Sequence, residues 1–344
     1  MKKLLKNILV PVLASRPVTS IADRLSGDGI PIFMAHRFSP TPAPDRHSPE
    51  FLRRCLRFLK DKGYSFVSLE DISMSLRGRK ALPPRSVAFS MDDGFIDQAE
   101  LAAPVFIEFN CPVTVFLITG MLDGRLWPWD DQVAHLVNMT RKTLLAPDFM
   151  GNMQPLPLSS QMEKSLAIRT IRNFIKSTSG NNIPGIIQSL SELTEVGITC
   201  SPPDNYRPMT WDMARKLEKS GIRFAPHTTS HRILSRLSDM ESKNEITESR
   251  LRLAEELSSP ANIFCYPTGR TADYGKREID FVRDAGYSGA VTTTPTYVDP
   301  KNMPDDYIYR LPRFGLPGSF VDFMQYSTWI ERAKTRISNR NYQS

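Results

Sequence analysis

The chain has 344 residues, of which 40% are hydrophobic and 24% are charged, so it is long enough to bury a full core in one or two globular domains. Its net charge of +7 favours anionic partners, such as an acidic glycan, a phosphorylated sugar carrier or an anionic lipid. Lysines and arginines do not form runs interleaved with aromatic residues, which argues against a dedicated nucleic-acid-binding protein.

The N-terminal segment, MKKLLKNILVPVLASRP, begins with basic residues and continues with apolar ones. Its unbroken apolar stretch, residues 8–14, contains Pro11 and is much shorter than the ~20 residues that span a bilayer. We interpret residues 1–28 as a basic amphipathic segment that makes a peripheral contact with a membrane surface in a cytoplasmic protein. The alternative is an atypical signal peptide followed by export. The four cysteines lie far apart without a CxxC pair, so a reducing compartment is the default expectation.

Short β-rich runs alternate with helical patterns along most of the chain. Continuous apolar runs separated by helices are typical of a parallel sheet that is covered on both faces. About seven such units predict an α/β fold, either a (β/α) barrel or a doubly wound sheet. The expected strands are residues 30–36, 66–69, 86–91, 113–119, 222–227, 262–268 and 289–294, with an eighth short run at 307–311. The expected helices are residues 48–62, 97–109, 210–220, 238–257 and 275–285.

One long stretch, from about residue 121 to 206, contains no convincing strand. The sequence there predicts helices joined by polar and Pro-containing links. We interpret it as a helical insertion in one loop of a barrel that covers residues 29–328, and such loop insertions commonly shape the access of a substrate. Residues 329–344 are interpreted as a basic C-terminal tail. The helices expected in the insertion are residues 131–145, 159–177 and 183–193.

Two adjacent carboxylates follow the apolar run that ends at Phe89. Asp92 and Asp93 stand in the sequence SMDDG, at the end of the expected strand. Like charges placed side by side repel each other, and a bound cation or a shared proton relieves that repulsion. A polar Asp-Asp-Gly turn that closes the strand is an equally simple interpretation of this motif alone.

Two of the five histidines lie four positions apart at the end of another expected strand. His227 and His231, in the sequence HTTSH, would face the same way in a helical turn, and imidazole is a standard ligand of zinc. Together with one carboxylate of the Asp pair they would make a three-ligand site, with positions left for water and substrate, as a catalytic zinc requires. The other carboxylate would then act as the base that deprotonates the attacking water.

Six segments, taken in order, resemble the polysaccharide deacetylase family, which shares the chitooligosaccharide deacetylase homology domain and is of the carbohydrate esterase type. The resemblance implies a distorted (β/α) barrel, a divalent metal usually taken to be Zn2+, and removal of acetyl groups from amino sugars. It also implies that Asp92 is the catalytic base and that Asp93, His227 and His231 hold the metal. The segments are SVAFSMDDGFIDQ, CPVTVFLITG, MTWDMARKLEKSGIRFAPHTTSH, IFCYPTGR, AGYSGAVTT and RLPRF.

The sequence departs from the family pattern in two places. Many members have an Arg-Pro-Pro-Tyr type of motif whose tyrosine amide helps to hold the oxyanion. Here FCYPTG resembles an FxYPxG variant, and we expect the amide of Tyr266 to take that part. Many members also supply the general acid from a late histidine, yet no histidine follows His231. Of His36, His47 and His135, we expect His36, which ends the first strand, to protonate the leaving amine.

Arg313, which follows the eighth run, is expected to orient Asp92 by a bidentate contact. The sequence thus predicts a metal-dependent hydrolase that removes N-acetyl (or O-acetyl) groups from an acetylated glycan or glycolipid, for instance an exopolysaccharide. Two alternatives remain open: an amide or imide hydrolase with a non-sugar substrate, and a catalytically inactive glycan-binding protein with the same fold. A phosphatase that uses Asp92 as nucleophile is disfavoured, because the usual Asp-x-Asp spacing is missing.

Overall fold

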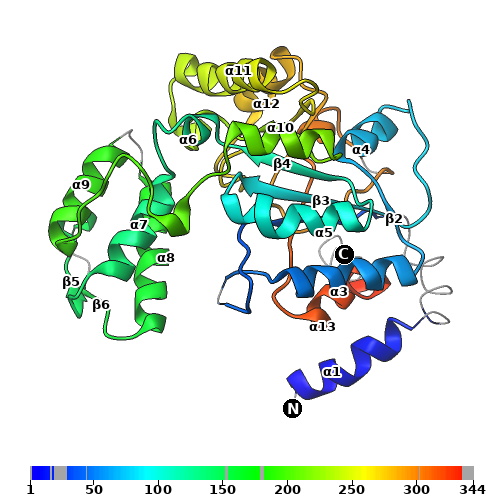
Figure 1. The fold of residues 1–344 in the computed structure, drawn as a ribbon, viewed down its shortest axis with the longest axis horizontal. Helices are drawn as coiled ribbons and strands as arrows, with labels where there is room; N and C mark the ends of the chain where they lie inside the picture. The colour runs from blue at the N-terminus through cyan, green and yellow to red at the C-terminus, as the bar shows by residue number, and fades with distance from the viewer. Residues whose placement is uncertain are drawn as a thin grey trace, which may run out of the picture.

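A parallel sheet lies at the centre of the structure, a computed structural model that describes residues 2–15, 18, 29–43, 45–151, 154–178, 182–301 and 303–334 (Figure 1). Its strands run in the order β10, β1, β3, β4, β7, and β2 pairs with the start of β3. The parallel pair β8 and β9 continues the arrangement, because Ala261 donates to the carbonyl of Phe224 in β7 (2.7 Å) and Val291 of β9 forms a bridge with Leu311. The strands follow one another around a distorted barrel, and the predicted α/β fold is confirmed. They are β1 (Ile32–Ala35), β2 (Ser65–Phe66), β3 (Ser86–Asp93), β4 (Val113–Leu117), β7 (Arg223–Pro226), β8 (Ile263–Cys265), β9 (Gly289–Val291) and β10 (Phe314–Gly315).

Helices join the strands and cover the sheet. The first helix after β1, α3 (Pro49–Asp61), begins as the sequence predicts: Ser48 accepts a hydrogen bond from the amide of Phe51 (3.1 Å), and Pro49 occupies the first helical position. The other helices of the barrel and its termini are α1 (Lys2–Leu13), α4 (Leu69–Leu76), α5 (Ala103–Glu108), α6 (Thr119–Leu122), α10 (Trp211–Lys219), α11 (Asp239–Glu256), α12 (Lys276–Asp284) and α13 (Phe320–Ser327). Short π-helical or 3-10 turns lie at Gln98–Ala102, Asp148–Met150, Asp204–Tyr206, Leu234–Arg236 and Tyr307–Tyr309.

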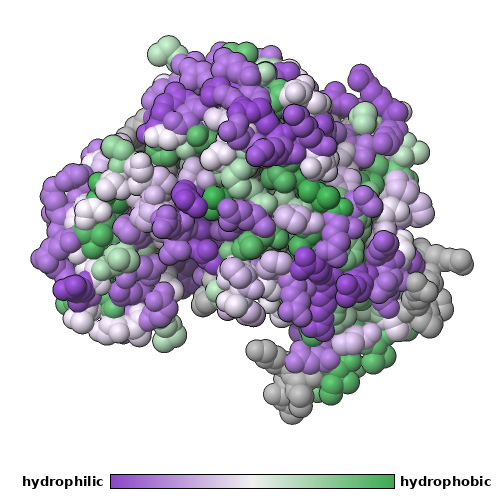
Figure 2. All heavy atoms as spheres, in the orientation of Figure 1, coloured by the Kyte–Doolittle hydropathy of each residue, from purple (hydrophilic) through white to green (hydrophobic). Residues whose placement is uncertain are grey.

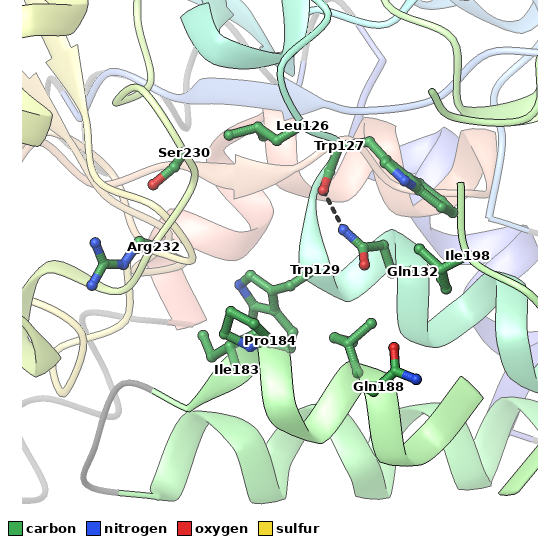
Figure 3. Close-up of a pocket in the computed structure, with 11 residues that line it drawn as sticks. Leu126, Trp127, Trp129, Gln132, Ile183, Pro184, Gln188, Ile198, Ser230 and Arg232 are labelled. Carbon is green, nitrogen blue, oxygen red and sulfur yellow. Dashed lines mark hydrogen bonds between the residues drawn. The ribbon is translucent and has the colours of Figure 1, made fainter. Parts of the chain in front are cut away.

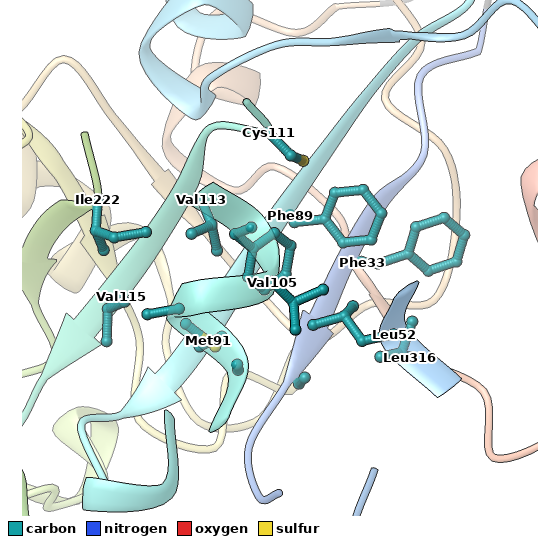
Figure 4. Packing of buried hydrophobic residues seen from close by; sticks show 14 of the residues in the cluster. Phe33, Leu52, Phe89, Met91, Val105, Cys111, Val113, Val115, Ile222 and Leu316 are labelled. Carbon is teal, nitrogen blue, oxygen red and sulfur yellow. The ribbon is translucent and has the colours of Figure 1, made fainter. Parts of the chain in front are cut away.

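Alternate residues of β3 pack into two different cores. Phe89 packs in the outer core, between the sheet and helices α3 and α5 (Figure 4). Ala88 packs in the inner core, with side chains of β4, β7 and β8. All eight residues of β3 are buried, which explains why this strand reads as an apolar run without alternation. Because side chains alternate along a strand, Ser90 and Asp92 share the inner side of the barrel with Ala88.

The helical insertion forms a lobe beside the barrel (Figure 1). Its helices α7, α8 and α9 pack around a hydrophobic cluster that also includes Ile233 of a barrel loop. The first of them ends at Met139, earlier than predicted, and a short antiparallel pair follows that the sequence did not predict. Strands of two residues are too short to leave an alternating pattern. The elements of the lobe are α7 (Trp129–Met139), β5 (Leu144–Leu145), β6 (Leu156–Pro157), α8 (Gln161–Ser177) and α9 (Ile183–Thr194).

Two expected strands differ from the structure. The run at 66–69 contributes only its first residue to β2, because Ser68 caps helix α4 in a capping box. Of the run at 307–311, Tyr307–Tyr309 form a 3-10 turn, and Leu311 alone forms a bridge to β9. Pro312 has no N–H to donate to a neighbouring strand, and β10 begins only after it.

Helix α1 lies against α13 and leaves an apolar face exposed. Val10 and Ala14 pack in a small cluster with Met324, and Lys6 forms an ion pair with Asp322. Figure 2 shows hydrophobic residues gathered on this helix at the edge of the molecule. The exposed apolar side chains are Leu5, Ile8, Leu9 and Val12, each 47–61% exposed.

Among the described residues, no helix combines the length and the hydropathy needed to cross a bilayer. The predicted N-terminal segment, residues 1–28, and the predicted tail, residues 329–344, both lie partly outside the described residues. The boundaries of the barrel and of the insertion likewise stay predictions. All four cysteines are described, and all four are free thiols.

Candidate active site

Asp92 is a buried carboxylate held by a buried arginine at the carboxyl end of β3. Arg313 donates from Nη1 to Oδ1 (2.7 Å) and from Nη2 to Oδ2 (2.8 Å), so the structure contains the bidentate contact that the sequence suggested. Ser90 Oγ and the carbonyl of Thr292 fix the guanidinium, each at 2.9 Å. Burial alone would raise the pKa of Asp92, but Arg313 and His36 hold it well below its usual value. Asp92 is therefore charged, as a general base must be.

Asp93, the next residue, faces two histidines. Its Oδ1 lies 3.6 Å from Nε2 of His227 and 3.6 Å from Nε2 of His231. The backbone of Asp93 has a φ of +82°, Gly94 follows at +85°, and His231 has a φ of +57°. A non-glycine residue in this left-handed region carries about 1–3 kcal/mol of strain, and such residues gather at functional sites. The turns after β3 and β7 thus adopt unfavourable conformations that bring these three side chains together.

The side chains of Asp93, His227 and His231 form a buried set of three ligands. Their candidate ligand atoms lie within 4.8 Å of one another. His227 Nδ1 lies 2.8 Å from the carbonyl oxygen of Cys265, so Nε2 is the nitrogen that faces Asp93. Burial, together with the charge of His231, lowers the pKa of His227 to about 3, so this imidazole is neutral. Asp93 Oδ1 is buried without a hydrogen-bond partner, and a bound cation would supply the interaction that this oxygen needs. One carboxylate and two imidazoles suit zinc.

The candidate ligand atoms of a second set, Asp92, His227 and Cys265, also lie within 4.8 Å of one another. Both oxygens of Asp92, however, already accept hydrogen bonds from Arg313. Burial also raises the pKa of the Cys265 thiol well above its usual value, and a protonated thiol is a poor metal ligand. Cys265 was not predicted from the sequence, where it lies in the middle of the expected strand 262–268; in the structure it ends β8. Its sulfur lies 3.1 Å from Arg313 Nη2 and so helps to hold the guanidinium.

His36 lies beside Asp92 at the open side of the site. Its Nε2 is 3.8 Å from Asp92 Oδ2, and its side chain is 45% exposed, whereas that of Asp92 is 2% exposed. The other two candidates for the acid pack elsewhere: His47 stacks on Phe51, and His135 packs against Trp127 in the lobe. His36 is thus the candidate that the structure places next to the carboxylate.

Tyr266 does not offer the free amide that the sequence suggested. Its N–H donates to the carbonyl of Val291 in β9 (3.4 Å), as part of the pairing between the two strands. Its hydroxyl donates to the carbonyl of Tyr309 (3.0 Å). Both donors of Tyr266 are therefore engaged in holding β8 in the barrel, and the structure does not support a role for this amide in holding an oxyanion.

The helical lobe contributes a carboxylate to the site, at a position where the sequence carries no ligand motif. Asp130, at the start of α7, places Oδ1 at 3.7 Å from Nδ1 of His231, the nitrogen that faces away from Asp93. Both atoms are buried and have no other partner. Burial alone would lower the pKa of His231, but Asp130, with Asp93 and Asp131, raises it to about 9. A carboxylate behind a ligand histidine fixes the ring and increases its basicity.

Removing the carboxylate of Asp130 is expected to weaken metal binding. In Asp130→Asn the ring of His231 loses its orienting partner, and such a loss typically lowers metal affinity by about 10–100-fold. Metal affinity is measured by competition with a chelator. The full loss of affinity in the variant, about 10–100-fold, is expected at pH 9 and above. At lower pH a metal must displace a proton from His231, so wild-type affinity falls by up to about tenfold per pH unit. Because the variant lacks the group that raises this pKa, its affinity should fall less steeply below pH 9.

Asp148→Asn is a suitable control for that measurement. Asp148 is an exposed carboxylate of the same lobe, and its Oδ1 accepts a hydrogen bond from the amide of Phe149 (2.8 Å). Its removal changes the charge of the lobe equally but should leave the metal affinity and its pH dependence unchanged. Identical pH curves for Asp130→Asn and the wild type would show that Asp130 does not act on His231.

The fold and the site together are those of a distorted α/β barrel with a fixed carboxylate beside a candidate metal centre. Residues 178–290 match the family model described as polysaccharide deacetylase. This stretch contains His227 and His231, whereas the Asp pair lies outside it. This third of the chain is therefore similar to the polysaccharide deacetylase family, the family that the sequence motifs resemble.

Solved structures share this fold at low sequence identity. The deacetylase PplD of Streptococcus pyogenes, in complex with acetate, is 18% identical with a TM-score of 0.56, over 87% of this chain and 98% of that one. IcaB from Ammonifex degensii is 16% identical with a TM-score of 0.56, over 89% and 98%. A de-N-acetylase from Aggregatibacter actinomycetemcomitans is 15% identical with a TM-score of 0.51, over 87% and 98%. A search of curated protein sequences gives no match.

Proposed function

We propose that the protein is a metal-dependent hydrolase that removes N-acetyl (or O-acetyl) groups from a sugar or polysaccharide, with Zn2+ as its metal. The observation that carries this proposal is the charged, buried carboxylate of Asp92, which Arg313 fixes beside a separate set of one aspartate and two histidines. Metal-assisted hydrolysis requires a base held beside a metal site, as Asp92 is here. The acetate bound to PplD, and the name de-N-acetylase of another neighbour, support an acetyl group as the group removed.

The residues of the site have separable tasks in this reaction. Asp93, His227 and His231 would hold the metal, whose chemistry is to polarise the acetyl carbonyl and to make water more acidic. Asp92 accepts the proton of the attacking water, and it can do so because Arg313 keeps it charged and in place. His36 then protonates the leaving nitrogen, so that acetate and a free amine are the products.

The proposed role of His36 predicts a difference between substrates. His36→Gln should slow cleavage of an N-acetyl sugar by about 10²–10⁴-fold, because an amine leaves only after it is protonated. Cleavage of 4-nitrophenyl acetate should change little, because the phenolate leaves without a proton. Steady-state kcat for the two substrates measures this. The control, His135→Gln, alters a histidine packed on Trp127 in the lobe and should leave both rates unchanged. Equal losses on both substrates would contradict an acid role for His36.

We also propose that the protein works at a membrane surface in the cytoplasm, with export through an atypical signal peptide as the alternative. The exposed apolar face of α1 and the net charge of +7 support a peripheral contact with anionic lipid. Co-sedimentation with anionic vesicles should exceed that with zwitterionic vesicles, and Ile8→Asp should abolish the difference.

Metal analysis of the purified protein, followed by acetate release from a small glycan panel, tests the proposed function. We expect bound zinc, and acetate from N-acetylglucosamine oligomers that disappears with a chelator and returns with added zinc. Hydrolysis of cyclic imides or small amides, without acetate from any glycan, would instead favour an amide or imide hydrolase. Glycan binding without metal or turnover would favour a catalytically inactive glycan-binding protein.

A further inference from the structure

A pocket of about 580 Å³ lies where the helical lobe meets the barrel (Figure 3). One wall comes from the lobe and includes Trp129, Ile183 and Ile187, and the other comes from the barrel loop that carries Ser230 and Arg232. The volume lies within the range of ordinary small-molecule sites, about 300–1,000 Å³. None of these side chains has a task in the deacetylation proposed above.

Three residues that line the pocket are chain neighbours of residues at the proposed metal site. Ser230 and Arg232 are the two neighbours of His231 in the chain. On the opposite wall, Trp129 immediately precedes Asp130, whose Oδ1 lies 3.7 Å from His231 Nδ1. The inference below requires that a substrate with its acetyl group at the metal site reaches the pocket with another part of the same molecule.

Most polar groups of the lining already have partners. The indole N–H of Trp127 donates to the carbonyl of Thr199 (3.0 Å), and the side-chain amide of Gln132 donates to the carbonyl of Trp127 (2.7 Å). The guanidinium of Arg232 forms an ion pair with Glu241 (2.8 Å). A sugar ring placed here would exchange the water around its hydroxyls for few new hydrogen bonds, which is unfavourable. The lining therefore argues against a sugar as the main occupant.

The remaining surface of the pocket is apolar, and one of its residues has a buried donor without a partner. Leu126, Ile183, Ile187 and Ile198 supply aliphatic side chains. Trp129 is only 5% exposed, and its indole N–H has no partner. In Figure 3 the indole nitrogen lies on the side of the ring toward the barrel loop. This combination suits an alkyl chain with a single oxygen acceptor at its head.

We infer that this pocket binds an alkyl chain joined to the sugar substrate, so that the substrate is an acetylated glycolipid; the identity of the sugar end rests on the proposed deacetylase function. The chain is either a straight fatty chain or a branched isoprenoid, which share this chemistry. The oxygen that joins the chain to the sugar accepts the hydrogen bond of the Trp129 indole.

Binding of alkyl glycosides to the metal-loaded Asp92→Asn variant, which is expected to keep its metal and lose most of its turnover, tests the pocket. The methyl and octyl glycosides of N-acetylglucosamine, and octyl glucoside without the acetyl group, are titrated below their micelle concentrations and followed by tryptophan fluorescence. Each buried methylene increases affinity about three- to fourfold, so the octyl compounds should bind at least about tenfold more tightly than the methyl glycoside. A geranyl and a decyl glycoside, which have ten carbons each, separate the two kinds of chain: tighter binding of the geranyl compound assigns an isoprenoid, and tighter binding of the decyl compound assigns a straight chain.

Three variants locate the binding. Ile183→Asp and Ile198→Asp, at partly exposed positions of the lining, should abolish the advantage of the octyl compounds. Leu166→Asp, on α8 and 50% exposed outside the lining, should keep it. Thermal melts followed by circular dichroism verify that all three fold. Equal affinity for methyl and octyl glycosides, or octyl binding that survives both pocket substitutions, overturns the inference.

The same experiments separate this inference from the proposed function. Binding of octyl glucoside in the pocket, without acetate release from any acetylated glycoside, would uphold the pocket and overturn only the deacetylase proposal. Metal-dependent acetate release with the same kcat/KM for methyl and octyl substrates would uphold the deacetylase and overturn the glycolipid inference.

Discussion

Replacing Asp92 with asparagine is expected to give a protein that keeps its metal and loses most of its turnover. Asparagine cannot accept the proton of the attacking water, so kcat for acetate release should fall by about 10²–10⁴-fold. Zinc content, measured by atomic spectroscopy, should stay at the wild-type value, because Arg313 rather than the metal site occupies both oxygens of Asp92. The change thus separates the base from the metal ligands.

The neighbouring carboxylate provides the comparison. Asp93→Ala removes an oxygen that lies 3.6 Å from both histidines, so this variant should lose metal and turnover together. Full activity of Asp92→Asn would refute its assignment as the base. Loss of zinc from Asp92→Asn with retention in Asp93→Ala would instead favour the set made of Asp92, His227 and Cys265.

Replacing Arg313 with methionine is expected to destabilise the protein strongly. Asp92 is 2% exposed and Arg313 is fully buried, so removal of the guanidinium leaves a buried carboxylate without its partner. Breaking one side of a buried pair typically costs about 3–5 kcal/mol. The free energy of unfolding at neutral pH, obtained from urea denaturation, should fall by about this amount. Turnover should fall as well, because Asp92 is then no longer held as a charged base.

A double-mutant cycle distinguishes loss of the ion pair from a general packing defect. The variant Asp92→Asn/Arg313→Met removes both charges, so it should recover much of the stability that Arg313→Met loses. Arg313→Lys keeps the positive charge without the bidentate geometry, so its free energy of unfolding should lie between those of the wild type and Arg313→Met. Strictly additive effects of the two single substitutions would mean that the pair contributes no coupling energy.

The central part of the site could be predicted because it depends on strand ends. Asp92 and Asp93 end β3, His227 follows β7, and both strands are paired in parallel with β4. The carboxyl ends of parallel strands meet at one edge of a sheet, so apolar runs followed by polar residues were enough to bring these side chains together. The contact between Arg313 and Asp92 was predicted from a strand expected at residues 307–311. In the structure Tyr307–Tyr309 form a 3-10 turn instead, although the contact is present.

The rest of the site depends on contacts that leave no trace in local patterns. Asp130 reaches His231 only because helices of the lobe pack against a barrel loop, and no periodicity in the sequence specifies that packing. The partner of the Tyr266 amide is set by the register of β8 against β9, two strands of three residues each. Short strands carry little register information, so the engaged amide could not be foreseen.

The contact between Asp130 and His231 makes the lobe and the metal centre thermodynamically dependent on each other. Reciprocity requires that whatever tightens the seating of α7 on the barrel loop also tightens metal binding, and by the same factor. Stripping the metal should then let the lobe open more readily, with faster amide exchange in α7 and easier proteolysis of its connecting segments. In this arrangement the packing of the lobe on the barrel and the binding of a metal at the site would stabilise each other.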